Sequence, residues 1–423
     1  MFKSLLALLR TPDLRKKVFI ILLLLVIFRI MATIPLPNVD REQLEVFLTS
    51  NQIFGLFNVF TGGAFRNISI ALLGVGPFIT ASIIMQLLTM VFPALKEMLN
   101  EGTDKERAKF MQYSRLLTVP LAALQGFGFL NLLSRQGVIV FANPIDLIRD
   151  IIIVTTASVF LMWLGELITE QKLGNGVSLI IFTGIVIGFP RQIMQTVVST
   201  DPTRIPNMIA FFAIALLMVV GVVFISRGER RIPVSYAKQV RGTKIYGGAS
   251  TYLPLKINQA GVIPIIFALS ILMFPQMISQ FLVNSQNPFM LKIALFLQGF
   301  NQQSLIYLAC YFGLVVLFTF FYTTITFNPE SIAENLQKRG GFVPGYRPGK
   351  ITSQYLVNTS HKVTFFGAIF LGMIAILPII MQQTTGITTF AIGGTSILIM
   401  VSVAIETMDT IEAQLIMREY EIS

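Results

Sequence analysis

The sequence has almost none of the side chains that carry covalent or metal chemistry. Its 423 residues include one cysteine, one histidine and one tryptophan. A single cysteine, Cys310, allows no intramolecular disulfide, so nothing in the chain requires an oxidising compartment. His361 stands beside Lys362, as a solvated loop residue would, and no HExxH pattern or nucleophile with a histidine partner occurs. These absences argue against an enzyme and predict no metal and no cofactor.

Charge is also scarce, and long apolar runs take its place. Charged residues make up 13% of the chain, about half the share of a typical soluble domain, and hydrophobic residues make up 54%. Ten segments are long and apolar enough to cross a bilayer, which takes about 20 residues. The sequence therefore predicts an all-α polytopic membrane protein with ten transmembrane helices. The segments are residues 18–36, 71–92, 115–133, 151–169, 177–198, 207–226, 257–281, 305–326, 363–381 and 389–411.

The basic residues are distributed unevenly between the predicted loops. If the N-terminus is cytoplasmic, most Lys and Arg residues fall on the cytoplasmic side, so both termini are expected there. The net charge of +11 then favours acidic lipid headgroups, acidic proteins or RNA as partners. Residues 1–17 predict a short interfacial helix that leads into the first span. A cleaved signal peptide is the alternative, but Arg29 interrupts the apolar region and no small-x-small site follows.

The predicted spans offer little for an ion or proton to bind. Apart from Arg29, their ionisable groups lie near the cytoplasmic span ends. Ion-coupled and proton-coupled carriers usually place such groups near the middle of the bilayer. The pattern therefore disfavours a coupled carrier. The groups near the span ends are Glu166, Glu170, Glu406 and Asp409.

Residues 55–66 form an apolar fragment that is too short to cross a membrane. As a helix, Gly55–Phe65 would rise about 16 Å, half of a hydrocarbon core of about 30 Å. Thr61, Gly62 and Gly63 would break it. Half-length or irregular backbone is tolerated at membrane depth only inside protein or beside a water-filled cavity. We therefore predict a re-entrant segment lodged in a cavity, with a surface helix on the outer side of the bundle as the alternative.

Two pairs of similar segments divide the chain into halves of five spans each. Gly74–Ile79 and Gly261–Ile266 are identical at four of six positions. Gly176–Ile181 resembles Gly394–Ile399 in the same register. Because each half has an odd number of spans, the second half would be inverted relative to the first.

The two halves would cover residues 1–200 and 201–423, and the isoleucines that coincide in the repeat would face a common axis. A ring of aliphatic side chains without charge is a hydrophobic constriction, which gates by dewetting. Ordinary packing within a helix bundle is the alternative for these residues. They are Ile79, Ile181, Ile266 and Ile399.

Two predicted cytoplasmic loops are longer than a connection requires. Residues 227–256 carry seven basic residues and one acidic residue, and their alternating pattern predicts a β-hairpin. Residues 328–362 contain a predicted short helix at 329–338, followed by a Gly/Pro-rich tip that bears Arg347. Long loops in compact structures are usually functional, although positive-inside bias alone would also account for the charge.

Several long motifs, in one order along all ten predicted spans, resemble those of the SecY family. That family supplies the channel subunits of the bacterial Sec protein translocase. The motifs with the closest resemblance lie at residues 74–93, 162–186, 227–242, 253–264, 327–350 and 393–399.

The resemblance implies a clamshell of two inverted five-helix halves around an hourglass pore, with residues 55–66 as a re-entrant plug half-helix. The pore ring would contain valine at two positions where the family often has isoleucine. The ring would be Val75, Ile79, Val177, Ile181, Ile266 and Ile399. The plug would contain Phe57, Asn58, Val59, Phe60, Thr61, Gly62 and Gly63.

The resemblance also implies a lateral gate, formed chiefly by spans 2, 3, 7 and 8, and a docking surface on the two long loops. Polar gate residues would link its sides weakly; the alternative is that they satisfy backbone groups near Pro77 and Pro264. These residues are Thr80, Gln86, Asn258 and Gln259. The docking residues would be Arg230, Arg231, Lys238, Arg241 and Arg347.

The function implied is a passive protein-conducting channel of the bacterial cytoplasmic membrane. It would pass unfolded polypeptides across the membrane and release transmembrane segments sideways into lipid. Its implied partners are the SecE and SecG membrane subunits, the SecA ATPase, the ribosome, signal peptides and membrane lipids. An inverted-repeat solute carrier and an insertase without a pore are the competing hypotheses.

Overall fold

Helices dominate the described chain, as its apolar composition predicts. The computed structural model describes residues 11–37, 39–40, 43–44, 61, 63–100, 102–199, 205–236, 238–241, 244–247, 250–282, 287–300, 304–385 and 389–422. The helices are α2 (Pro12–Thr33), η1 (Phe65–Asn67, a 3-10 helix), α5 (Gly76–Val91), α6 (Pro93–Asn100), α7 (Asp104–Arg135), α8 (Pro144–Glu170), α9 (Gly176–Ser199), α10 (Ile205–Arg227), α11 (Ile263–Leu282), α12 (Pro288–Gln298), α13 (Leu305–Thr326), α14 (Pro329–Lys338), α15 (Lys350–Thr385) and α16 (Thr389–Ile422). The strands are β1 (Glu229–Tyr236), β2 (Lys238–Arg241), β3 (Lys244–Gly247), β4 (Ser250–Lys256) and β5 (Gly341–Phe342).

Each of the ten predicted apolar segments overlaps one of these helices, and α13 has the predicted bounds 305–326. Within the described residues, four helices are long and apolar enough to cross a membrane. A fifth is added if α5 and α6, which meet at a bend of 117°, form one broken span. The structure therefore contains several apolar helices of membrane-spanning length, and the number of crossings remains a prediction.

Two predicted helix starts are wrong, and the reason is the same in both places. The apolar pattern predicts helix from residues 71 and 257, but residues 71–75 and 257–262 form turns and bends before α5 and α11. Gly74 and Gly261 have φ angles of 55° and 62° in these turns. Hydropathy does not detect such turns, because residues 71–75 are all apolar and a hydropathy window averages Asn258 and Gln259 with the apolar residues of α11 that follow.

The charged segment between the second and third predicted spans, which the hydropathy pattern leaves as a loop, is largely helical, because it contains α6 and the start of α7. A capping box begins α7, in which the backbone N–H of Thr103 donates to Glu106 Oε2 at 2.7 Å. In the same way, α15 begins at Lys350 instead of residue 363. Hydropathy windows end where charges begin, whereas backbone hydrogen bonds continue a helix into water.

Where the structure describes the predicted interfacial helix at residues 1–17, the chain is already part of the first spanning helix, α2. The first span begins as α2 at Pro12, so the basic run at residues 15–17 lies within α2. Residues 1–10 lie outside the described residues. Proline at the first helical position suits this start, because its missing N–H would have no helical partner there.

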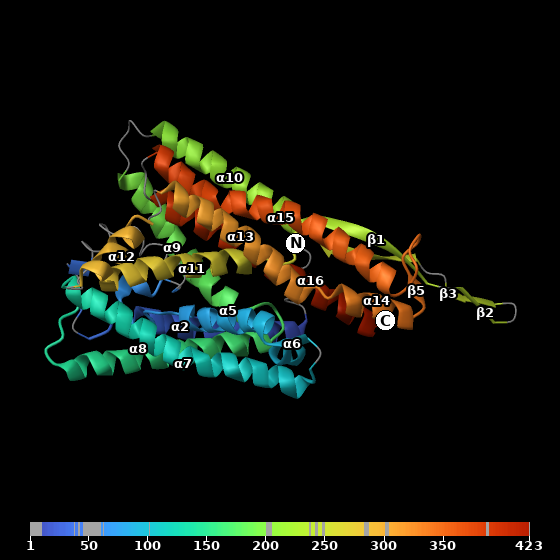
Figure 1. Cartoon of the computed structure of the whole chain (residues 1–423), viewed down its shortest axis with the longest axis horizontal. Coiled ribbons are helices and arrows are strands. Elements are labelled where there is room, and N and C mark those ends of the chain that lie inside the picture. Colours follow the sequence, from blue (N-terminus) through green and yellow to red (C-terminus); the bar gives the residue numbers. More distant parts are fainter. Residues whose placement is uncertain are drawn as a thin grey trace.

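The helices lie in two groups on opposite sides of the molecule (Figure 1). One group contains α2, α5, α7 and α8, and the other contains α10, α13 and α15. α9 packs against both α8 and α16, and α11 packs against α5, α7 and α13. The two sequence halves are thus joined along one seam between α9 and α16 and another between α5 or α7 and α11.

The strands project beyond one end of the helices (Figure 1). The predicted hairpin of the first long loop is confirmed: β1 and β4 are antiparallel, with Ile232 opposite Leu253. The predicted helix at 329–338 is confirmed as α14. The sequence did not predict β5, which comes from the second long loop and pairs with β1, placing Ser235 opposite Phe342.

Three hydrophobic clusters account for the described core. The largest spans both sequence halves, and a second packs the chain between α2 and α8. A third lies under the strands, where Ile232, Leu255, Val343 and Leu356 are buried together. Strand β5 of the second long loop joins β1 and β4 of the first loop in one sheet of order β4-β1-β5, and Val343 and Leu356 pack against it.

Candidate functional site

The chain between α2 and α5 runs through the interior without forming an α-helix, apart from the single 3-10 turn of η1. Most of residues 64–75 are buried. The backbone N–H of Leu36 donates to the carbonyl of Ile68 at 2.9 Å, and that of Ile70 donates to the carbonyl of Ile34 at 2.9 Å. Irregular backbone at membrane depth needs such internal partners, since lipid offers none. The stretch therefore meets the physical requirement for non-helical chain inside a membrane protein.

Two of the seven predicted plug residues lie just before this stretch. Thr61 is 1% exposed, and its Oγ1 accepts a hydrogen bond from the backbone N–H of Phe65 at 3.2 Å. A Cβ on Gly63 would lie 3.5 Å from Arg29 Nη1 and 3.8 Å from the carbonyl oxygen of Gly184. This end of the predicted plug is therefore adjacent to α2 and α9. The others, Phe57, Asn58, Val59, Phe60 and Gly62, lie outside the described residues.

The six predicted ring residues belong to one hydrophobic cluster. Five are buried and no more than 6% exposed, and Val177 is half-buried against them. They come from α9, α11, α16 and the start of α5, so both sequence halves contribute to the cluster. All six are aliphatic and offer no group for an ion or polar ligand. The residues are Val75, Ile79, Val177, Ile181, Ile266 and Ile399.

The first pair of repeated segments also has the same backbone conformation. Gly74 and Gly261 both have positive φ one residue before a valine that accepts the first helical hydrogen bond. The N–H of Ile79 donates to the carbonyl of Val75 at 3.1 Å, and that of Ile266 donates to the carbonyl of Val262 at 3.2 Å. The repeat therefore places Ile79 and Ile266 at the same position in the first turns of α5 and α11.

The second pair of repeated segments differs in conformation. Gly176 begins α9, whereas Gly394 lies within α16. Gly176 is needed for contact, since a Cβ there would lie 1.9 Å from the carbonyl oxygen of Gly165 in α8. No sequence pattern indicates this close approach, because the partner glycine is in another helix.

The predicted gate residues make local hydrogen bonds where their bonds are described. Thr80 Oγ1 donates to the carbonyl of Gly76 at 3.1 Å, and Asn258 Nδ2 donates to the carbonyl of Gly261 at 3.2 Å. These bonds fit the alternative in which such residues satisfy nearby backbone groups. Among the described residues, Gln86 Oε1 and Asn258 Oδ1 are buried without a partner, and Gln259 is half-buried.

The predicted docking residues all lie on the two long loops, at the strand end of the molecule. Arg230, Arg231 and Arg347 are exposed, and Arg231 forms an ion pair with Glu229 at 2.7 Å. The carbonyl of Arg347 accepts a hydrogen bond from Thr352 Oγ1 at 2.8 Å, which fixes the backbone of the tip. The other two, Lys238 and Arg241, lie in β2, which pairs with β3.

On α14, close to the predicted docking residues, one positive and one negative side chain form an ion pair. Lys338 donates to Glu334 at 2.8 Å, and this hydrogen bond lowers the pKa of Glu334 below its ordinary value. The carboxylate therefore stays ionised at neutral pH and offsets one positive charge. The exposed arginines of β1 and the tip keep the surface basic overall.

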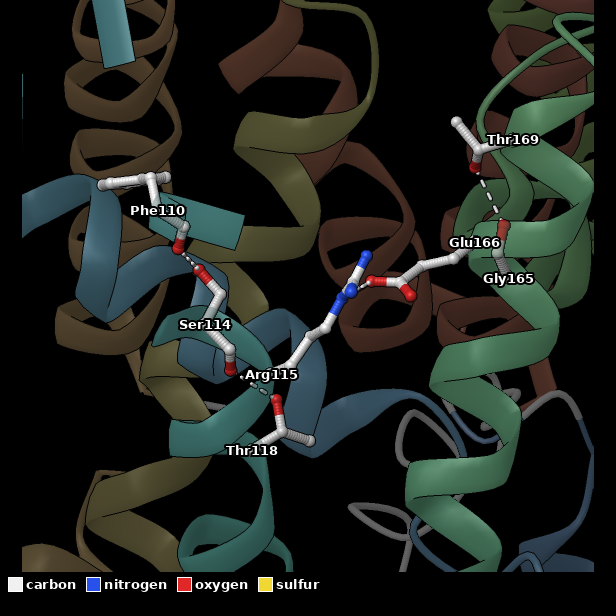
Figure 2. A network of polar contacts seen from close by, with 7 residues as sticks. All are labelled: Phe110, Ser114, Arg115, Thr118, Gly165, Glu166 and Thr169. Carbon is white, nitrogen blue, oxygen red and sulfur yellow. Dashed lines mark hydrogen bonds and ion pairs between the residues drawn. The ribbon is translucent and has the colours of Figure 1, made fainter. Parts of the chain in front are cut away.

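Sequence reasoning missed an ion pair that joins the first two long helices. Arg115 of α7 donates from Nε to Glu166 Oε1 of α8 at 2.7 Å (Figure 2). Beside it, Thr169 Oγ1 donates to the carbonyl of Gly165 and accepts from the N–H of Gly176. No sequence pattern pairs residues so far apart, so only the packing of α7 on α8 shows it.

The described residues contain no group of three or more His, Cys, Asp or Glu side chains placed to hold a metal ion. They offer instead a buried hydrophobic cluster built from both sequence halves, a stretch of irregular backbone between α2 and α5, and a basic sheet at one end. This combination defines a multi-helix membrane protein of the channel or transporter class.

Comparison with known proteins identifies the family within that class. The SecY family profile matches residues 69–408. The chain is 42% identical to the Protein translocase subunit SecY of Corynebacterium glutamicum, with 97% of each chain covered. It is also 42% identical to that of Streptomyces galbus, with 97% of each covered. The chain belongs to the SecY family.

Solved structures agree on the fold. A structure described as a protein conducting channel matches with a TM-score of 0.66 and 18% identity over 94% of this chain and 91% of that one. A second structure matches with a TM-score of 0.61 and 18% identity over 92% of this chain and 90% of that one. It is of a SecY protein whose plug domain is described as stabilising the closed channel and sealing the membrane. Sec61 in a canine ribosome-channel complex matches with a TM-score of 0.61 and 17% identity over 94% of this chain and 91% of that one.

Proposed function

We propose that this chain is the protein-conducting channel of a bacterial Sec translocase. The observation that carries this proposal is that six aliphatic side chains from α9, α11, α16 and the start of α5 belong to the one hydrophobic cluster that spans both sequence halves. A channel for polypeptides of any sequence cannot recognise specific polar groups. An aliphatic constriction can close around any chain, and it resists ions because water leaves a narrow apolar passage.

The arrangement proposed in the membrane has ten crossings in two inverted halves, residues 1–200 and 201–423. Residues 55–66 are the plug, and both termini face the cytoplasm. Support comes from the overlap of every predicted segment with a helix and from the shared backbone conformation at Gly74 and Gly261. A plug domain is described for one structurally similar SecY protein.

A lateral gate between α5 or α7 and α11 would sort segments between the pore and lipid. On insertion scales, a central Leu gains roughly 0.3–0.6 kcal/mol and a central Arg or Asp costs roughly 2.5–3.5 kcal/mol. A stretch of about 20 apolar residues would therefore leave sideways, and a charged stretch would pass through. The gate residues would be Thr80, Gln86, Asn258 and Gln259.

The energy for transport would come from a partner, so the chain itself would be a passive channel. The basic cytoplasmic sheet and the Arg347 tip are the proposed docking surface for the SecA ATPase or the ribosome. One structurally similar channel is described in a ribosome complex. SecE, SecG and signal peptides are the other proposed partners, in the bacterial cytoplasmic membrane.

Site-directed crosslinking tests the channel directly. A translocation intermediate stalled halfway across reconstituted membranes is probed from photoreactive residues placed at Ile79, Ile181, Ile266 and Ile399. Ile152 of α8 and Ile278 of α11, which are 60% and 47% exposed, serve as controls. Crosslinks from the four buried positions to one short substrate stretch would support a single-file pore. Substrate found only at the exposed controls would overturn the pore and favour a lipid-facing insertase.

A further inference from the structure

The six residues between β4 and α11, residues 257–262, connect the β4-β1-β5 sheet directly to α11. We call them the connector. Helix α11 belongs to the hydrophobic cluster that contains the six predicted ring residues. Ile266, a member of that cluster, lies four residues beyond the end of the connector. The connector is therefore the covalent link between the sheet and α11.

The first residue of the connector is fixed by backbone contacts on two sides. The N–H of Ile257 donates to the carbonyl of Gly228 at 2.9 Å, which closes the base of the β1–β4 hairpin. On the other side lies α15, where a Cβ on Gly367 would come within 2.5 Å of the Ile257 carbonyl oxygen. Only glycine at position 367 leaves room for the connector in its present place.

An ion pair and a local hydrogen bond hold the two ends of the connector. Just before it, Lys256 Nζ lies 2.8 Å from Asp409 Oδ2 of α16, with side chains 52% and 32% exposed. Near its far end, Asn258 Nδ2 donates to the carbonyl of Gly261, whose positive φ turns the chain into α11. The connector is thus held against α15 and α16 at once.

We propose that Gly367, Lys256 and Asp409 are positioning residues that set where α11 begins. They thereby link the position of the β4-β1-β5 sheet, part of the proposed docking surface, to closure of the channel. This proposal rests on the proposed function for its effect on transport. The positioning itself does not, because it concerns only the place of α11. Buried packing is close to crystal density, so a shift forced at one contact is passed to its neighbours.

The sharpest variant is Gly367→Ala, which adds one methyl group against the connector. Its matched control is Gly313→Ala in α13, where a Cβ would meet nothing within 4 Å. Spin labels replace Ile278 of α11 and Leu124 of α7, both exposed, in a background with Cys310→Ser. Their distance is measured by electron spin resonance in detergent. We expect a shift of roughly 1–2 Å, typical of helix shifts at interfaces, for Gly367→Ala alone.

The ion pair provides a second test that does not depend on how Gly367→Ala folds. Lys256→Asp and Asp409→Lys would each leave two like charges in contact, and the double variant would restore an opposite pair. We expect each single variant to broaden the spin-label distance and to raise ion leak through sealed proteoliposomes about threefold, as suits a partly exposed pair. The double variant should return both towards the parent values.

The two measurements separate this inference from the proposed function. An unchanged spin-label distance in Gly367→Ala and in both single charge variants would overturn the positioning role. A changed spin-label distance supports the positioning role, whether or not ion leak through the proteoliposomes changes. If the distance changes while ion leak stays at the parent value in every variant, α11 is positioned by the connector but does not close a channel, which contradicts the proposed function.

Discussion

At the scale of single residues, glycines decide where the backbone can run. Gly74 and Gly261 supply the left-handed turns before α5 and α11. Gly176 and Gly367 instead permit close approach, because a Cβ on either would lie within 2.5 Å of a carbonyl oxygen in another element. The two roles look identical in the sequence, where each is a glycine beside apolar residues.

Gly176→Ala should destabilise the protein by about 1–3 kcal/mol, as overpacking of a tight contact does. The added Cβ would lie 1.9 Å from the carbonyl oxygen of Gly165, so α8 and α9 would have to separate. Gly188→Ala in the same helix is the control, since nothing lies within 4 Å there. Thermal unfolding in detergent measures both, and equal midpoints would contradict the contact.

Arg347→Glu should block protein translocation without loss of folded protein. Arg347 is exposed at a tip whose backbone is fixed by Thr352, so reversing its charge changes the docking surface and no buried contact. Arg339→Glu, an exposed charge reversal beside the same tip, is the control. The measurement is transport of a secreted protein into membrane vesicles, and normal transport by Arg347→Glu would exclude the docking role.

At the scale of elements, local capping and distant packing act on different parts of the same helix. The start of α7 is fixed by the Thr103–Glu106 capping box, which the sequence pattern T-x-x-E announces. Farther along the helix, α7 is tied to α8 by Arg115 and Glu166 (Figure 2). The cap is a local property, whereas the ion pair exists only after the helices pack.

The start of α7 should loosen in acid. Hydrogen bonds from the backbone and side chain of Thr103 lower the pKa of Glu106 below its ordinary value of 4.5. A pKa lowered in the folded state stabilises the cap above the unfolded pKa, and this contribution is lost as pH falls through the folded pKa. Amides of the first turn should therefore exchange faster as pH falls below about 4, after correction for intrinsic exchange rates.

Thr103→Val separates the two hydrogen bonds. It removes the hydroxyl and keeps the backbone N–H, which is the larger cause of the shift. The pKa of Glu106 should therefore rise only part of the way to its ordinary value, as followed by carboxyl carbon chemical shifts. A pKa equal to that of the parent would show that the hydroxyl contributes nothing.

At the scale of the whole molecule, two seams join the sequence halves. One lies between α9 and α16, and the other between α5 or α7 and α11. The chain between α2 and α5 lies inside this arrangement, and its buried backbone is paired with residues 34–36. A clamshell needs one seam that stays closed and one that opens, and these two seams provide the candidates.

Deletion of residues 57–65 should make the resting membrane leaky to ions, because the proposed plug would no longer fill the passage beside the constriction. Ion flux through proteoliposomes without substrate or motor is the measurement. Phe65→Ala is the control: it removes the edge-to-face contact with Phe129, whose ring centroid lies 6.1 Å away, and keeps the rest of the segment. A sealed deletion variant would favour a scaffold or insertase without a pore.

The sequence by itself determined the elements that depend on near neighbours. Apolar runs located the helices, alternation located the β1–β4 hairpin, and the short helix predicted at residues 329–338 is α14. The resemblance of its motifs also identified the family. These predictions succeeded because hydrophobicity, strand alternation and capping act over a few residues.

The tertiary structure alone decided which distant segments meet. β5 joins β1 across more than a hundred residues, Lys256 meets Asp409, and Gly367 faces the carbonyl of Ile257. The same is true of the large hydrophobic cluster that joins the two sequence halves and includes Ile79, Ile181, Ile266 and Ile399; that these four face one axis stays a prediction. Such contacts depend on how whole helices pack, and packing responds to the shape of both partners, of which a local sequence pattern describes only one.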